Sequence, residues 1–131
     1  MSDVDTAGFV EQASAYGFDE TVQRLIKAVE DAGMTVLARI DHAAGARKVG
    51  LAMPNTVVML YGHPRGGTPI MQAAPHAALD LPLRALIRDT EGGKVMVAYH
   101  PIADLLRRDG VSDEMARRLE PAQKLLLEAI R

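Results

Sequence analysis

One stretch of the sequence combines glycine, proline, histidine and arginine between an apolar run and a helix-like segment: GHPRGGTPIMQ, residues 62–72. The backbone N–H groups of Gly66, Gly67 and the first helical turn are expected to lack acceptors, and a helix start carries about half a positive charge. Together with the positive charge of Arg65, these N–H groups indicate a binding site for a phosphate, sulfate or carboxylate. The alternative is a turn that Thr68 caps, since the Lys-Ser/Thr pair of a P-loop is missing.

Four histidines are further candidates for chemistry: His42, His63, His76 and His100. No pair has the i,i+4 spacing of a zinc-binding helix, so we expect neither a metal nor a cofactor. His63 and His100 each follow a predicted strand and would converge if those strands were neighbours. His42 could act as a general base beside a substrate, although a structural role in capping a loop is the simpler explanation.

The composition excludes several classes of function. There is no cysteine, so disulfides, thiolate catalysis and cysteine-ligated metals are excluded. The formal net charge of -2 disfavours nucleic acid and acidic membranes as partners. No serine lies in a nucleophile-elbow motif, which argues against serine hydrolysis. The acidic first twenty residues and the short apolar runs predict a cytoplasmic protein without a membrane span.

The first half of the chain predicts one helix followed by two strands. Apolar residues at i, i+3, i+4 and i+7 indicate a helix over residues 20–32, which Asp19 caps and Gly33 ends. Apolar and β-branched runs indicate strands over 34–41 and 55–62, joined by a short helix and a loop. The glycine-rich stretch therefore follows directly after a strand.

A short helix is predicted to follow the glycine-rich stretch. Thr68 is a suitable N-cap and Pro69 is suited to the first helical position, so the helix is expected over 69–74. Pro75 ends it, and a further helical turn is predicted over 76–79.

The second half predicts a β-hairpin and then helices. Strands over 83–89 and 94–100 flank a turn in which two glycines can adopt positive φ. A short helix is predicted over 101–108. Ser112 is expected to cap a last helix, which Pro121 interrupts.

This order of elements favours an α+β fold, a two-layer sandwich with helices packed on an antiparallel or mixed sheet. Several strands are apolar on both faces; Val58 and Leu60, for example, alternate with three other apolar residues. The second apolar face of the sheet must therefore also be covered, either by the C-terminal helix or by a second copy of the chain, and we expect a homodimer.

Residues 47–111 contain a specific combination of motifs: GHPRGGTPIMQ, then LDLPL at 79–83, then a hairpin strand that ends in Tyr99. The combination resembles the bacterial family called domain of unknown function 302, whose pattern contains GTPLMQ. His63 and His100 stand where that pattern has asparagine. The resemblance implies a two-layer α/β fold that dimerises, and it brings no established activity. We expect residues 1–131 to form a single domain. Within it, residues 18–111 form the family-like core and residues 112–131 a C-terminal helical extension.

Three functions follow as alternatives. The first is a non-enzymatic homodimeric module that binds a small anionic or polar ligand. The second is an enzyme that uses a histidine as acid or base on such a ligand, and the third is a structural interaction domain. The candidate ligand-binding residues are His42, His63, Arg65, Gly66, Gly67, Thr68, Gln72 and Tyr99. Tyr61 and the methionines Met53, Met59, Met71 and Met96 are predicted to fill the core or a pocket.

Overall fold

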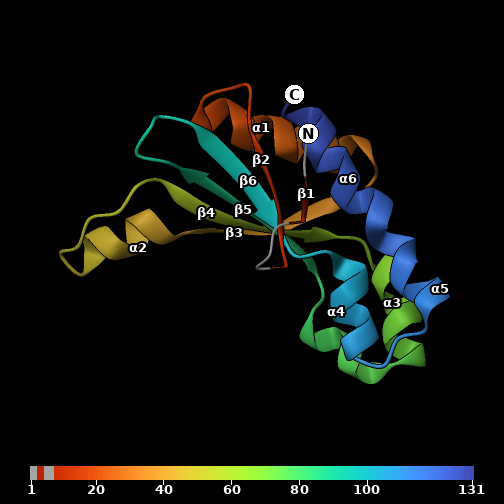
Figure 1. Ribbon diagram of the computed structural model, residues 1–131. Coiled ribbons are helices and arrows are strands. Elements are labelled where there is room, and N and C mark those ends of the chain that lie inside the picture. Colours follow the sequence, from red (N-terminus) through yellow and green to blue (C-terminus); the bar gives the residue numbers. More distant parts are fainter. Residues whose placement is uncertain (1–2, 5–7) are drawn as a thin grey trace.

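The computed structural model describes residues 3–4 and 8–131 and contains a six-stranded sheet with helices packed on it (Figure 1). The strands lie in the order β1-β2-β6-β5-β4-β3, and neighbouring strands are antiparallel. This confirms the predicted α+β fold. The strands are β1 Asp3–Val4, β2 Val10–Ala13, β3 Thr35–Asp41, β4 Thr56–Gly62, β5 Leu83–Asp89 and β6 Val95–Tyr99.

The helices follow the predicted order with different boundaries. They are α1 Phe18–Asp31, α2 His42–Lys48, α3 Pro64–Ala73, α4 Ile102–Arg108, α5 Asp113–Ala116 and α6 Glu120–Ala129, with short 3-10 helices η1 Pro75–Leu79 and η2 Arg117–Leu119. Gly17 rather than Asp19 occupies the N-cap of α1 and makes no side-chain cap. Ser112 caps α5 as predicted, and the last helix is interrupted at η2, just before Pro121.

One face of the sheet forms the main core. β4, β5 and β6 direct alternate apolar side chains toward α1 and α6, and α1 contributes Val22, Leu25 and Val29. Leu126 from α6 and Ile130 at its C-cap join the same cluster and are completely buried. Both helices lie above the sheet in Figure 1. The C-terminal helix therefore packs on the same side as α1 and does not cover the second face.

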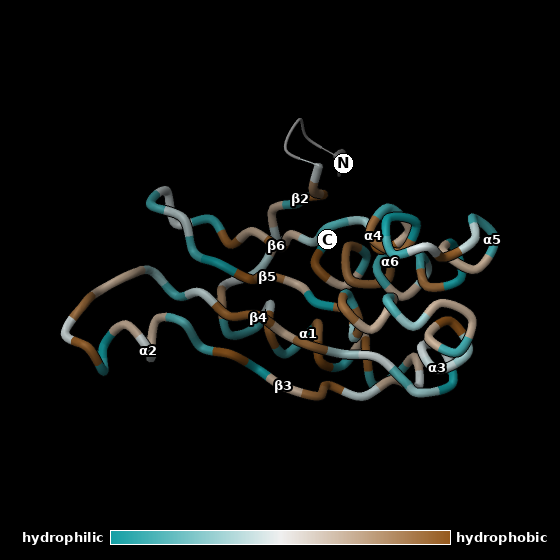
Figure 2. The backbone as a smooth tube through the Cα atoms, turned by 90° about the horizontal axis from the view of Figure 1, so that it is seen from below, coloured by the Kyte–Doolittle hydropathy of each residue, from teal (hydrophilic) through white to brown (hydrophobic). Residues whose placement is uncertain are grey.

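The second face, here called the open face, carries the other alternating residues of the strands. Figure 2 looks from below, where the strands lie between the viewer and α1. The strand registers place the following residues on it: Glu11, Thr56, Val58, Leu60, Arg84, Leu86, Arg88, Met96 and Ala98. No helix in the described ranges packs over the middle of this face, so its apolar residues are covered only by their neighbours' side chains.

The N-terminal strand β2 was not predicted from the sequence, and it connects the two ends of the described chain. It pairs with β6, and the backbone N–H of Ala15 donates to the carbonyl of Ile130 at 2.8 Å. The Tyr16 hydroxyl donates to the carbonyl of Arg131 at 2.9 Å. These contacts fix the end of α6 against the first strands.

A second distinctive region is the arm, residues 37–53, which comprises most of β3, then α2 and the loop to β4. Figure 1 shows α2 projecting away from the other helices, and Figure 2 shows the same projection from below. Of the six strongly exposed large hydrophobic side chains among the described residues, five lie in the arm: Leu37, Ile40, Val49, Leu51 and Met53. Met53 was predicted to fill the core or a pocket, and the structure contradicts the core alternative, because Met53 is 42% exposed.

Candidate functional site

The helix after β4 begins at Pro64, and the prediction of a helix start at Pro69 with Thr68 as its cap was wrong. His63 is the N-cap, and its Nδ1 accepts from the backbone N–H of Arg65 at 3.0 Å. Its carbonyl accepts from the N–H groups of Gly66 at 3.0 Å and Gly67 at 3.2 Å. Pro64 has no N–H, and the next three N–H groups of the first turn all donate to His63, so every donor of this turn already has an acceptor. The free N–H groups assumed for anion binding are therefore not present there.

The eight residues predicted to bind a ligand lie in three places. Six of them lie along α3 and its cap, where His63, Arg65, Thr68 and Gln72 are exposed. His42 is the first residue of α2 and is also exposed. Tyr99 ends β6 and is 9% exposed. The structure thus groups the α3 residues with one another but does not bring His42 or Tyr99 into that group.

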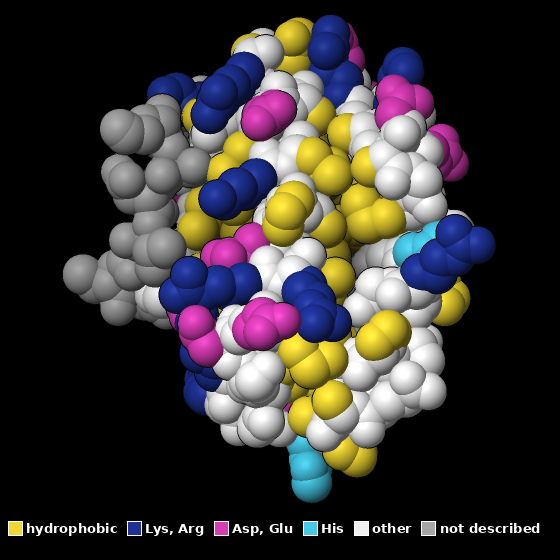
Figure 3. Space-filling view, turned by 90° about the vertical axis from the view of Figure 1, so that its right-hand side faces the viewer, with side chains coloured by type: hydrophobic (Ala, Val, Ile, Leu, Met, Phe, Trp, Pro, Cys, Tyr) yellow, Lys and Arg dark blue, Asp and Glu magenta, His cyan; other side chains and the backbone are white. Residues whose placement is uncertain are grey.

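The histidines do not form a cluster. The Asp41 carboxylate beside His42 accepts from the N–H of Ala44 at 2.9 Å, so it serves as a helix cap. β5 separates β4 from β6, so His63 and His100 do not follow neighbouring strands. In the described part of the chain, no three His, Asp or Glu side chains are placed to hold a metal ion. On the helical end of the molecule the visible histidines lie at two separate places, one beside a basic side chain and the other at the lower edge of the view next to hydrophobic and uncharged surface (Figure 3).

The two strand-end tyrosines are largely core residues. The Tyr61 hydroxyl donates to the carbonyl of Ala122 at 2.8 Å, and burial raises the pKa of Tyr61 far above its ordinary value. Tyr99 packs with Val10 and Leu127, and its pKa is raised by burial and by the negative charge of Glu120. Both phenols therefore stay neutral at physiological pH.

A cavity of about 350 Å³ lies on the open face. Its floor is a row of short apolar side chains, since Leu86 pairs with Val58 on one side and with Ala98 on the other. Longer side chains border this row: Phe9, His100 and Arg84 toward one end of the strands, Arg88 toward the other, and Glu11, on β2, beside Ala98. The aromatic wall is formed by Phe9 and His100, whose rings meet edge to face with centroids 6.3 Å apart.

The two arginines that border the cavity differ in whether they have an ion-pair partner. Arg88 forms an ion pair with Glu11, with 3.2 Å between Nη2 and Oε2. Arg84 makes no side-chain hydrogen bond or ion pair with any residue that the structure describes. The cavity therefore combines an apolar floor with one arginine that has no counter-charge among the described residues, which is suited to an anionic group attached to an apolar body.

Sequence reasoning missed this cavity, although part of its signal is visible in the sequence. Residues 84, 86 and 88 alternate Arg-Leu-Arg within a strand that was predicted correctly, so they must share one face. The contribution of Phe9 had no such signal, because β2 was not predicted. The small size of Ala98 has meaning only once its neighbours on β5 and β2 are known.

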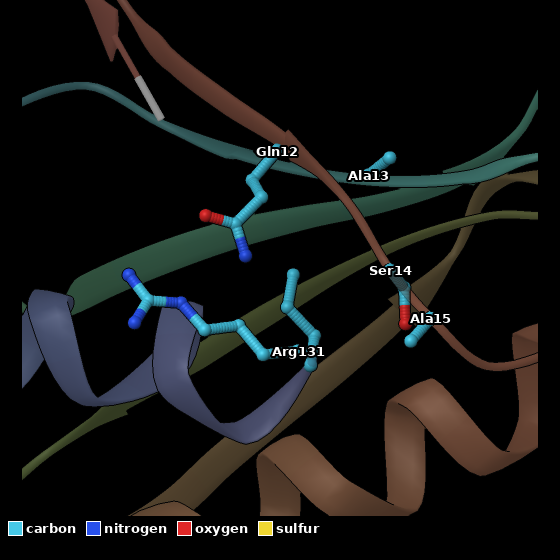
Figure 4. A pocket seen from close by; sticks show the side chains of 6 residues that line it. Gln12, Ala13, Ser14, Ala15 and Arg131 are labelled. Carbon is cyan, nitrogen blue, oxygen red and sulfur yellow. The ribbon is translucent and has the colours of Figure 1, made fainter. Parts of the chain in front are cut away.

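A second cavity of about 310 Å³ lies between β2 and the end of α6 (Figure 4). The Gln12 Nε2 atom donates to the carbonyl of Leu127 at 3.0 Å. The Gln12 Oε1 atom is buried without a hydrogen-bond partner among the described residues. In Figure 4 this oxygen lies on the same side as the Arg131 guanidinium. The rest of the lining is mostly small, with Ala13, Ser14 and Ala15.

Comparisons with known proteins agree with this fold. The sequence profile of the family described as "Domain of unknown function DUF302" matches residues 10–130. A crystal structure titled as an uncharacterized conserved protein DUF302 from Bacillus stearothermophilus superposes with a TM-score of 0.81. The superposition covers 94% of this chain and 95% of the Bacillus chain. The sequence identity is 14%, so the likeness is evidence for the fold alone.

The curated relatives are longer proteins. The chain is 36% identical over 118 residues to the fluoride-specific ion channel FluC 1 of Brucella suis, and 36% identical over 118 residues to that of Brucella abortus. The match covers 88% of this chain but only 46% and 44% of those two proteins. No helix in the described ranges has the length and hydrophobicity needed to cross a membrane.

Proposed function

The chain belongs to the family described as domain of unknown function DUF302, and from that premise we propose that it is a non-enzymatic, homodimeric module that binds a small anionic or polar ligand. The Brucella relatives support the idea of a module, since they contain a similar segment within a protein about twice as long. A cytoplasmic location stays a prediction from the sequence.

The observation that carries the ligand proposal is the open-face cavity with Arg84 at its border. It offers about 350 Å³ of space, an apolar floor and a cation without a partner among the described residues. The start of α3 offers Arg65 as an exposed cation, but its backbone donors are already bound to His63. The cavity is therefore the better-supported location, and of the residues predicted from the sequence Tyr99 borders it.

Binding is favoured over catalysis by the surroundings of His42 and His63, the two histidines among the predicted ligand-binding residues that could serve as acid or base. His42 and His63 are exposed, and the Nδ1 of His63 is used as a helix cap. A general base needs a substrate within hydrogen-bond reach and a group that orients it. The cap contact of His63 already occupies the nitrogen that such a group would hold.

The homodimer proposal is supported by the arm. Val49 and Leu51 are 72% and 66% exposed, and large exposed apolar groups of this kind mark interaction surfaces. We expect light scattering at micromolar concentration to give the mass of two chains. Leu51→Asp should give the mass of one chain, whereas Leu79→Asp, at an equally exposed position outside the arm, should leave the dimer intact. A single-chain mass for the wild type would refute the dimer.

Ligand binding is tested with simple anions at constant ionic strength. Acetate, phosphate and sulfate should raise the thermal midpoint relative to chloride, because a ligand that binds only the folded state stabilises it. Arg84→Gln should reduce the rise, and Arg65→Gln serves as the matched control on α3. A loss of the response in Arg65→Gln alone would place the ligand at α3 instead. No response to any anion would refute the ligand proposal.

A further inference from the structure

We propose that the ligand of the open-face cavity is a short amphipathic monocarboxylate, with its carboxylate on Arg84 and its apolar chain over Leu86 and Ala98. This inference rests on the proposed function, because it assumes that the cavity is the ligand site. It adds the chemical class, the charge and the approximate length of the ligand.

The strand registers arrange the open face in rows that run across the sheet. In one row Leu60 lies beside Arg84. In the next row Leu86 lies between Val58 and Ala98, and Glu11 follows on β2. The third row places Arg88 between Thr56 and Met96. Because alternate residues on a strand are about 6.6 Å apart, the two arginines stand about 13 Å apart across the apolar row.

Ala98 is the residue that makes the hollow. It occupies the middle row between the longer side chains of Leu86 and Glu11. It is only 6% exposed although it carries a single methyl group, because the neighbouring side chains rise above it. A water molecule takes about 30 Å³ in the liquid, so a cavity of this size holds roughly ten heavy atoms. A carboxylate of six to eight carbons fits that volume.

The charge pattern favours one carboxylate at one end. Arg84 presents a planar fork that matches a carboxylate with two parallel hydrogen bonds. At the other end Arg88 is already paired with Glu11. A second anionic group on the ligand would meet the Glu11 carboxylate and would have to displace it from Arg88. A monocarboxylate is therefore preferred over a dicarboxylate of the same length.

The experiment is a calorimetric titration of the full chain with acetate, butyrate, hexanoate, octanoate and decanoate at constant ionic strength. Each methylene over the apolar row should lower the Kd about fourfold until the cavity is full, after which the Kd should level off. Adipate, a dicarboxylate with the chain length of hexanoate, should bind more weakly than hexanoate. Inorganic phosphate is titrated in parallel as an anion without an apolar body.

Two variants test the location. Ala98→Leu fills the hollow and should abolish the dependence on chain length, whereas Ala13→Leu, at an exposed position on β2, should keep it. Leu86→Ala widens the floor and should move the length of tightest binding toward octanoate or decanoate, which keeps a readout if Ala98→Leu fails to fold. Circular dichroism checks the fold of each variant.

The outcomes separate this inference from the proposed function. Binding of phosphate through Arg84 without any effect of chain length would overturn the monocarboxylate and leave an anion-binding module. A chain-length effect that Ala98→Leu leaves unchanged would place the apolar body elsewhere and would overturn the inference. Failure of both carboxylates and phosphate to bind would overturn both proposals.

Discussion

Replacing Gln123 should destabilise the protein much more than replacing an ordinary surface glutamine. Its side chain is 4% exposed and bridges two backbone groups on either side of Pro101. Its Oε1 accepts from the N–H of Ile102 at 3.0 Å, and its Nε2 donates to the carbonyl of His100 at 2.9 Å. Because α4 has no cap from its own N-terminal residues, α6 provides the hydrogen-bond partners at its start.

The cost of Gln123→Ala can be worked from these two contacts. Leaving the N–H of Ile102 without a partner costs about 1–3 kcal/mol, because this residue is buried. The bond to the carbonyl of His100 is only part-buried and His100 itself is exposed, so the loss of this bond costs only about 0.5–1.5 kcal/mol. The lost methylene adds about 0.8 kcal/mol. The total of about 2–5 kcal/mol is a large fraction of the 5–15 kcal/mol that a domain usually has.

Urea denaturation followed by circular dichroism measures this loss, and Gln12→Ala is the matched control. Gln12 is also buried, but it makes one hydrogen bond and its second polar atom has no partner among the described residues. Its replacement removes that buried acceptor together with the bond, so it should cost about 1 kcal/mol or less. A Gln123→Ala variant within about 0.5 kcal/mol of the wild type, or a larger loss for Gln12→Ala, would refute the reasoning.

Three further predictions concern other parts of the fold. Tyr61→Phe should cost about 1 kcal/mol in urea denaturation, because the carbonyl of Ala122 loses its donor; an unchanged midpoint would contradict that role. Gly67→Ala should leave the free energy of unfolding unchanged or raise it by up to about 1 kcal/mol. Gly67 is helical, its φ is not positive, and an added Cβ would meet side chains only at 3.7 Å. A clear loss of stability would contradict the helical start at Pro64. The pKa of Asp109 is raised by the neighbouring Asp80 carboxyl group, with which a protonated Asp109 can share a hydrogen bond, and by burial. The folded state therefore binds this proton more tightly and loses that stability as the pH rises through the raised pKa. Asp80→Asn should therefore gain stability relative to the wild type between pH 4 and pH 7 in thermal scans, and a constant difference would argue against the pair.

The hairpin could be predicted from the sequence because its signals are local. β5 begins and ends where predicted, and Gly93 has the positive φ that the turn needs. The start of α3 could not be predicted in the same way. Pro64 and two glycines are typical of a turn, but a proline at the first helical position loses no intrahelical bond, and the His63 side chain replaces the usual capping residue. The same residues therefore fit both a turn and a helix start, and the structure shows the helix start.

β2 and the open-face cavity could not be derived from local patterns. β2 has four residues, and one of its buried side chains is the polar Gln12, which hides the usual alternation. Its partner β6 lies more than eighty residues further along the chain, as the pairing of Val10 with Tyr99 shows. The cavity depends on that pairing, because Phe9 and Glu11 reach His100 and Arg88 only across it.

The contacts between β2 and the end of α6 have a consequence for biosynthesis. Gln12 and Leu127, and likewise Tyr16 and Arg131, are joined by hydrogen bonds across 115 positions of the sequence. During translation, β2 leaves the ribosome long before β6 and α6, so it must wait without its β6 partner. Closing such distant contacts is slow, and the waiting chain exposes surface that can associate with other chains. The hairpin of β5 and β6 and the helix α1 can form from local contacts. The hydrogen bonds between the segment around β2 and the end of α6 can form only after the residues around 130 have emerged.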